Sequence, residues 1–129
     1  MEVPLRAALL AWLAADPALF GQLNTIAEEA PSRTALPWLA ISASASADWS
    51  AKDVAGREVR IALELHCRGD QPTSAAALVA AIEARMASLP AAQPGFRVVT
   101  AQFLRARAEQ RGSNTRAILI EYRFRVLAS

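Results

Sequence analysis

Apolar and polar positions alternate clearly over residues 58–67 of the chain. One side of this segment is apolar, and charged or small residues stand between its members: Val59, Ile61, Leu63, Leu65 and Cys67. A two-residue period of this kind is typical of an antiparallel strand with one buried face. Gly69 and Pro72 follow at once, so the strand is expected to end near residue 68.

Three further segments have the period or composition of strands. Residues 38–47 begin with Trp38 and end in alternating serine and alanine, without the large side chains usual in a core strand. Residues 96–108 and 116–127 flank a polar stretch, 109–115, that contains Gly112 and Asn114. Glycine and asparagine are common turn residues, so the last two strands are predicted to form a hairpin.

Two segments have the helical period instead. In residues 3–15 apolar side chains recur three or four positions apart, and Asp16 and Pro17 stop the pattern. In residues 73–89 a stripe formed by Leu78, Ile82 and Met86 predicts a second helix that ends before Pro90.

The resulting order, α-β-β-α-β-β, predicts an α+β fold. We expect a mainly antiparallel four-stranded sheet with two helices on one face. With 129 residues, the chain has the length of a single domain, residues 1–129.

Composition narrows the functional classes. Hydrophobic residues make up 53% of the chain, but alanine supplies many of them, so the core is expected to be modest and oligomerisation to support it. No apolar run is long enough to cross a membrane. The single cysteine cannot form an internal disulfide, and a net charge of +2 is too small to argue for nucleic-acid binding by itself.

The sequence lacks the common catalytic signatures. It contains no glycine-rich phosphate loop, no cysteine and histidine spacing for a metal, and no nucleophile elbow, so we expect neither an enzyme nor a cofactor. His66, the one histidine, stands on the polar side of its strand and is interpreted as a surface or interface residue. Cys67 falls on the apolar side of the same strand and is interpreted as a small core residue.

Arginines gather on the predicted hairpin. If Arg105 pairs near Leu119, five of them share one face with Val99, Phe103 and Glu121: Arg97, Arg105, Arg107, Arg123 and Arg125. One interpretation is a solvated face with cross-strand ion pairs, such as Glu121 beside Arg105 or Arg123. The other is a subunit contact, because the apolar members are poorly suited to open water.

Trp49 stands out in a polar loop, residues 48–57. Two interpretations are equally open. The indole folds back onto the core, or it remains exposed and anchors a partner.

The chain resembles the tail completion, or tail terminator, proteins of long-tailed phages and prophages. The resemblance is carried by residues 5–13, by the run from Leu36 to Ser42, by Asp48-Trp49 with Lys52, and by the strand from Gly56 to Leu65. It continues in the helix at 75–89, in Phe96-Arg97-Val98-Val99 and in the run from Tyr122 to Val126. Order and spacing carry the resemblance over nearly the whole chain.

The resemblance implies a structural subunit that forms a hexameric ring. Such a ring caps the head-proximal end of the tail tube, stops tube polymerisation and meets the head connector or stopper protein, while DNA passes through the lumen without specific binding. It implies location in the virion tail, in a phage, a prophage or a gene transfer agent, with assembly in the host cytoplasm and no membrane. Two alternatives remain: a small ferredoxin-like ligand-binding or enzyme subunit, and a head–tail connector adaptor.

A ring of this kind needs contacts to its neighbours, to the tube and to the connector. The predicted contact residues are Trp49, Lys52, Arg57, Arg105, Arg107, Arg111, Arg123 and Arg125, with Glu109 and Asn114 beside Arg111 at the hairpin tip. The strand arginines are expected to pair with Glu58, Glu64 or Glu121 of a neighbour. Because many lumen arginines would grip passing DNA, we expect a mixed or weakly acidic lumen.

Overall fold

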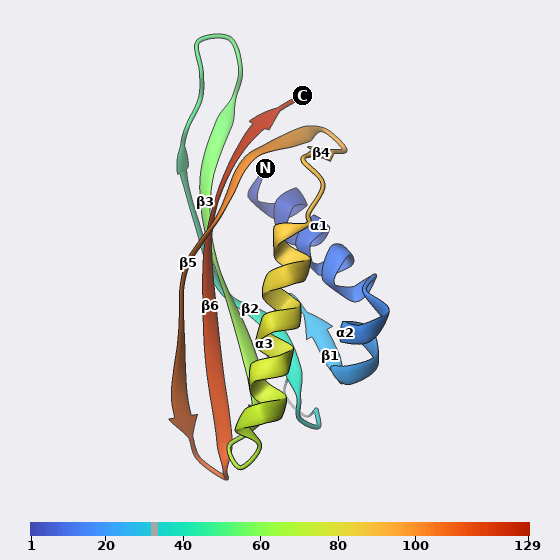
Figure 1. Ribbon diagram of the computed structural model, residues 1–129. Coiled ribbons are helices and arrows are strands. Elements are labelled where there is room, and N and C mark those ends of the chain that lie inside the picture. Colours follow the sequence, from blue (N-terminus) through green and yellow to red (C-terminus); the bar gives the residue numbers. More distant parts are fainter. Residues whose placement is uncertain (32–33) are drawn as a thin grey trace.

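The computed structural model describes residues 1–31 and 34–129 (Figure 1). Three helices and six strands follow one another in the order α-α-β-β-β-α-β-β-β. Their bounds are α1 Glu2–Ala14, α2 Pro17–Gln22, β1 Thr25–Ala27, β2 Trp38–Asp48, β3 Gly56–Arg68, α3 Pro72–Ala87, β4 Ala92–Gln93, β5 Phe96–Arg111 and β6 Thr115–Ala128.

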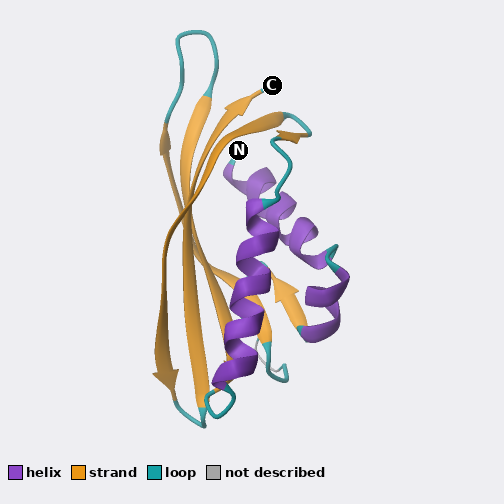
Figure 2. Ribbon diagram, viewed as in Figure 1, coloured by secondary structure: helices purple, strands orange, loops and turns teal. Residues whose placement is uncertain are grey.

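The six strands form one curled sheet in the order β1-β2-β3-β6-β5-β4. The pair β1–β2 is parallel, and the other pairs are antiparallel. All three helices lie against one face of the sheet and leave the other face uncovered (Figure 2). We call the uncovered side the helix-free face.

The predicted fold class, a four-stranded antiparallel sheet with two helices, is therefore wrong. The sheet is six-stranded and mixed, because β1 and β4 are added at its two edges. These strands have three and two residues, which is too short to produce a readable period. The third helix, α2, begins where Asp16 accepts a hydrogen bond from the N–H of Ala18, so Asp16 and Pro17 start a helix as well as ending one.

The hydrophobic core lies between the helices and the covered face of β3 and β6. Leu5, Leu9 and Leu13 of α1 are fully buried there, as is Phe124 of β6. The alternation on β3 predicted this face, and burial follows it from Val59 to Cys67. The core therefore rests mainly on two central strands, and the outer strands contribute little to it.

A reciprocal contact fixes α1 against α3. The indole Nε1 of Trp12 donates to the carbonyl of Arg85 over 2.8 Å, and Arg85 Nε donates to the carbonyl of Trp12 over 2.7 Å. The guanidinium of Arg85 also lies 3.5 Å from the centre of the Trp12 ring, which is a cation–π arrangement. Both helices are thus held as one layer over the sheet.

Candidate functional site

Most charged side chains of the long strands lie on the helix-free face. The strand register places eight arginines and four glutamates there. They are Arg60, Arg68, Arg97, Arg105, Arg107, Arg111, Arg123 and Arg125, with Glu58, Glu64, Glu109 and Glu121. This face is therefore considerably more positive than the chain as a whole, whose net charge is +2.

Two bulges in β5 decide which side chains share this face. Register shifts occur between Val98 and Thr100 and between Phe103 and Arg105, and they cancel one another. Arg97 and Arg105 consequently fall on the same face, as the sequence predicted, although Arg105 lies opposite Glu121 and not Leu119. Between the two bulges the alternation is shifted by one residue, so odd-numbered residues point to the helix side. The expectation that Phe103 shares the arginine face is therefore wrong, because Phe103 lies opposite Tyr122 on the helix side.

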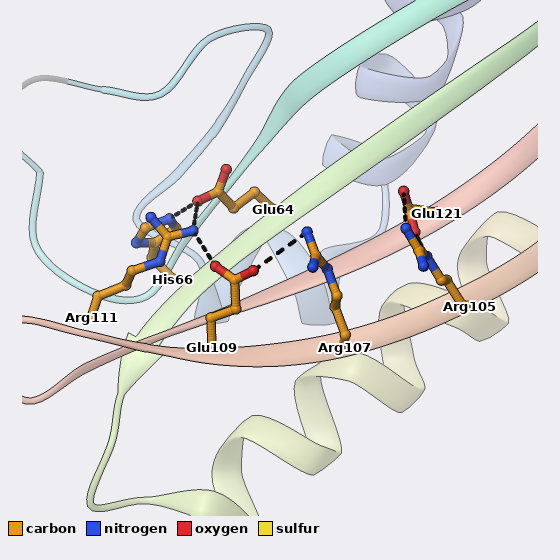
Figure 3. Close-up of polar contacts among 7 residues, drawn as sticks. All are labelled: Glu64, His66, Arg105, Arg107, Glu109, Arg111 and Glu121. Atoms are coloured by element: carbon orange, nitrogen blue, oxygen red, sulfur yellow. Dashed lines mark hydrogen bonds and ion pairs between the residues drawn. The ribbon is translucent and has the colours of Figure 1, made fainter.

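Cross-strand ion pairs within the chain join charges of the helix-free face, and Figure 3 draws the pair of Arg105 with Glu121. Arg105 of β5 binds Glu121 of β6, and this hydrogen bond lowers the pKa of Glu121. Arg125 Nε donates to Glu58 Oε2 over 3.1 Å. These are the intramolecular pairs of the solvated-face interpretation, and each such pair at a surface contributes less than about 1 kcal/mol.

A second group of charges lies near the hairpin end of the sheet (Figure 3). Glu109 lies 3.4 Å from Arg107 and 2.9 Å from Arg111, and Arg111 reaches Glu64 over 3.5 Å. Glu64 in turn contacts Nε2 of His66. Glu58, Glu64 and Glu121, which we expected to pair with a neighbouring subunit, therefore have arginine partners in their own chain.

On this face His66 packs against the aromatic side chain of Trp38. Its ring stacks on Trp38 with 3.9 Å between the ring centres and an angle of 10° between the planes. Trp38 is 8% exposed, so the pair closes this end of the sheet. Cys67 points to the opposite, covered side, where burial raises the pKa of its thiol. The two residues are neighbours in sequence but lie on different faces.

Arg123 lies at the centre of the helix-free face. It stands directly opposite Arg60 of β3, and like charges in that position repel one another. A terminal nitrogen of its guanidinium donates to Gln102, whereas its Nε is buried and has no hydrogen-bond partner among the described residues. Arg60 was not among the predicted contact residues, although the alternation along β3 puts it on the same side as Glu58 and Glu64.

A shallow hollow of about 510 Å³ lies on the same face. Its floor consists largely of Ala43, Ala45 and Ala62, and the charged groups beside it include Arg105 and Glu121, which bind each other. A small-ligand site usually offers several polar groups that converge on the ligand. This hollow instead offers a floor of small side chains on which another polypeptide could rest.

The loop between β2 and β3, residues 49–55, projects beyond one end of the sheet, opposite the β5–β6 turn (Figure 1). Trp49 at its base is half-buried and is not part of the hydrophobic core; the guanidinium of Arg125 lies 5.5 Å from its ring centre. A side chain at Gly56 would approach the Trp49 carbonyl to 2.4 Å, so glycine permits this close return. Lys52 is exposed in the loop.

Three expected contact residues lie in elements other than those predicted. Arg57 belongs to β3 and not to the loop, because β3 begins at Gly56. Glu109 and Arg111 belong to β5, since the turn contains only residues 112–114. Ser113 and Asn114 adopt positive φ angles of 61° and 56° there, which matches the turn chemistry expected of asparagine.

Tyr122 gives the fold a measurable response to alkali. Burial of the phenol, with a smaller contribution from the negative charge of Glu83, raises its pKa to about 12. The folded state therefore keeps a proton that the unfolded state loses near pH 10, so stability is present below pH 10 and falls toward pH 12. At ~1.4 kcal/mol per pKa unit the loss reaches at most about 2–3 kcal/mol.

The chain contains one tyrosine, so the absorbance of tyrosinate reports this group alone. We expect a midpoint near pH 12 in the folded protein, and Tyr122→Phe should remove most of the alkaline loss of stability in urea unfolding. A midpoint near pH 10 in the folded protein would contradict the burial of this phenol.

Within the described ranges 1–31 and 34–129, no group of three or more histidine, cysteine or acidic side chains is placed to hold a metal ion. None of the helices in those ranges is both long and apolar enough to span a membrane.

Comparison with known proteins gives matches of two kinds. The family model described as "Tail completion protein gp17" matches residues 7–127. Among solved structures, a chain of the "Virion of native gene transfer agent (GTA) particle" superposes with a TM-score of 0.79 at 26% identity, over 98% of this chain and 96% of that one. No curated protein sequence matches the chain. The family match spans nearly the whole sequence, so the chain belongs to the tail completion protein gp17 family and is a structural protein of a phage-type virion tail.

Proposed function

We propose that the protein forms a hexameric ring at the head-proximal end of the tail tube. There it stops tube polymerisation and joins the tail to the head connector or stopper protein, while DNA passes through its lumen without specific binding. The observation that supports this role most strongly is the family match over residues 7–127. The likeness to a chain of a gene transfer agent virion favours that kind of particle as the host structure.

The surfaces available for the three contacts lie in different parts of the molecule. The projecting loop with Trp49 and Lys52 and the turn beyond Arg111 lie at opposite ends of the sheet, as a ring between tube and connector requires (Figure 1). Arg57 lies beside that loop. We propose that the strand arginines contribute to the neighbour contact, Arg105 and Arg107 directly from β5 and Arg123 and Arg125 from β6 behind them.

Native mass spectrometry of the purified protein tests the ring. We expect a hexamer of the 13.8 kDa chain, with monomer increasing on dilution, because the small core favours association. A chain that stays monomeric at high concentration, alone and when mixed with tail tubes, would contradict the ring.

A further inference from the structure

The two long outer strands of the sheet, β2 and β5, are covered only in part by the short edge strands β1 and β4. β1 pairs only with Trp38, Leu39 and Ala40 of β2, which leaves Ile41–Asp48 without a strand on that side. β4 pairs only with Phe96 and Arg97 of β5, and one further bond joins the N–H of Val98 to Ala91. Among the residues that the structure describes, no strand covers the outer edge of β5 from Val99 to Arg111.

Exposed edges are normally protected by lysine, proline or charges that point inward. The free part of β2 begins with a bulge between Ile41 and Ala43, and Arg6 of α1 reaches Ser44 from the helix side. Beyond the bulge, alanine and serine alternate to Ala47 and pair regularly with β3, without lysine or proline. On β5 the two bulges interrupt the edge, but the seven residues from Arg105 to Arg111 pair regularly with β6. One smooth free stretch therefore exists on each side of the sheet.

The two edges run in opposite directions. β2, β3, β6 and β5 are antiparallel to one another in succession, so β2 and β5 have opposite polarity. A second copy placed beside the first would bring its β2 against β5 in the antiparallel sense. The edges differ from one another, so this contact is head-to-tail, and repeated head-to-tail contacts form a ring when the rotation between copies closes.

We propose that neighbouring subunits join by pairing the β2 edge of one copy with the β5 edge of the next. This proposal rests on the proposed ring and names the contact that builds it. Its register places Ala45 of one copy opposite Arg107 of the other, with Ser46 opposite Ala106 and Ser44 opposite Ala108.

Side-chain size is complementary in this register. Ala43, Ala45 and Ala47 are on the helix-free side of β2, whereas β5 presents Arg105 and Arg107 on the same side. Small residues leave room for the long arginine side chains to lie across the seam. On the helix side, Ser44 and Ser46 of one copy and Ala106 and Ala108 of the other are equally small.

The proposed register displaces neighbouring copies along the strand direction, and the size of this displacement is compatible with a closed ring. Ala45 is level with Arg60 of β3, whereas Arg107 is level with Glu64, four residues further along that strand. At ~3.4 Å per residue the displacement is about 14 Å. Four long strands at ~4.8 Å spacing span about 19 Å, so the strands would tilt by about 36° from the ring axis. Closed barrels have strand tilts of about 35–45°.

Disulfide cross-linking tests the contact. The double variant S46C/A106C, with Cys67→Ala to remove the native thiol, carries one cysteine on each edge, both exposed and on the helix side. After mild oxidation, non-reducing gels should show a ladder of covalent oligomers up to the hexamer. The matched control S46C/A84C places the second cysteine on the exposed side of α3 and should remain mostly monomeric.

A charge on the edge gives an independent readout that needs no oxidation. Ala47→Lys places a cation opposite Arg105 of the neighbour and opposite Glu58 of its own chain. It should therefore weaken association at least about tenfold without lowering the melting temperature of the monomer. Ala84→Lys, the control on α3, should change neither quantity.

The outcomes separate this proposal from the ring itself. A hexamer in native mass spectrometry without a ladder above the control overturns edge pairing and leaves the ring in place. Cross-linking of either single-cysteine variant with itself shows like edges in contact and also overturns the proposal. A monomer without a ladder contradicts both the edge contact and the ring.

Discussion

Phe124→Ala is expected to lower the free energy of unfolding by about 3–5 kcal/mol. Phe124 is fully buried on the helix side of β6, near the centre of the core. Removal of a buried aromatic ring loses its transfer free energy and leaves a cavity that the surrounding side chains fill only in part. Urea unfolding followed by circular dichroism measures the change.

Phe103→Ala is the matched control, because Phe103 lies on the same face but on the uncovered strand β5 and is 46% exposed. It should cost less than about 1 kcal/mol in the monomer. Equal losses in the two variants would mean that the helices cover β5 as fully as they cover β6, which would contradict the fold described.

Trp49→Ala is expected to weaken ring association by upward of roughly 2 kcal/mol, or at least about thirtyfold. The indole is half-buried, outside the core, and lies at the base of the projecting loop beside Arg125. An aromatic side chain held in this way loses little entropy when a partner covers it. Analytical ultracentrifugation over a concentration series measures the change.

The control for this variant is Trp38→Ala. Trp38 is 8% exposed and stacked on His66, so its truncation should destabilise the folded chain. If Trp49→Ala lowers the melting temperature as much as Trp38→Ala and leaves association unchanged, Trp49 supports the fold and does not anchor a partner.

The sequence predicted the parts of the fold whose periodicity is strong. The alternation from Val59 to Cys67 placed β3 and its buried face correctly, and the stripe from Leu78 to Met86 placed α3. The edge strands were missed because β1 and β4 take their conformation from the neighbours they pair with, not from a period of their own. Tertiary contacts decide such short elements.

The candidate site shows the same limit at the level of single residues. Alternation along the strands placed Arg105, Arg107, Arg123 and Arg125 on one face correctly. It also placed Arg97 correctly, because the two bulges between Arg97 and Arg105 cancel one another. The same alternation gave the wrong face for Phe103, because Phe103 lies between those bulges. A bulge depends on local pairing that leaves no clear mark in the composition of β5. The ion pair of Arg105 with Glu121 was among the predicted pairs, whereas the stacking of His66 on Trp38 needed the register of β2 against β3.

The central claim is that this tail protein ends the tube and joins it to the head. The most direct measurement is the distribution of tail lengths, by electron microscopy, in particles made with and without its gene. We expect overlong tails without heads when the gene is deleted, and tails of normal, uniform length on filled heads when the wild-type gene is restored. Tails of normal length joined to heads in the deletion strain would contradict it.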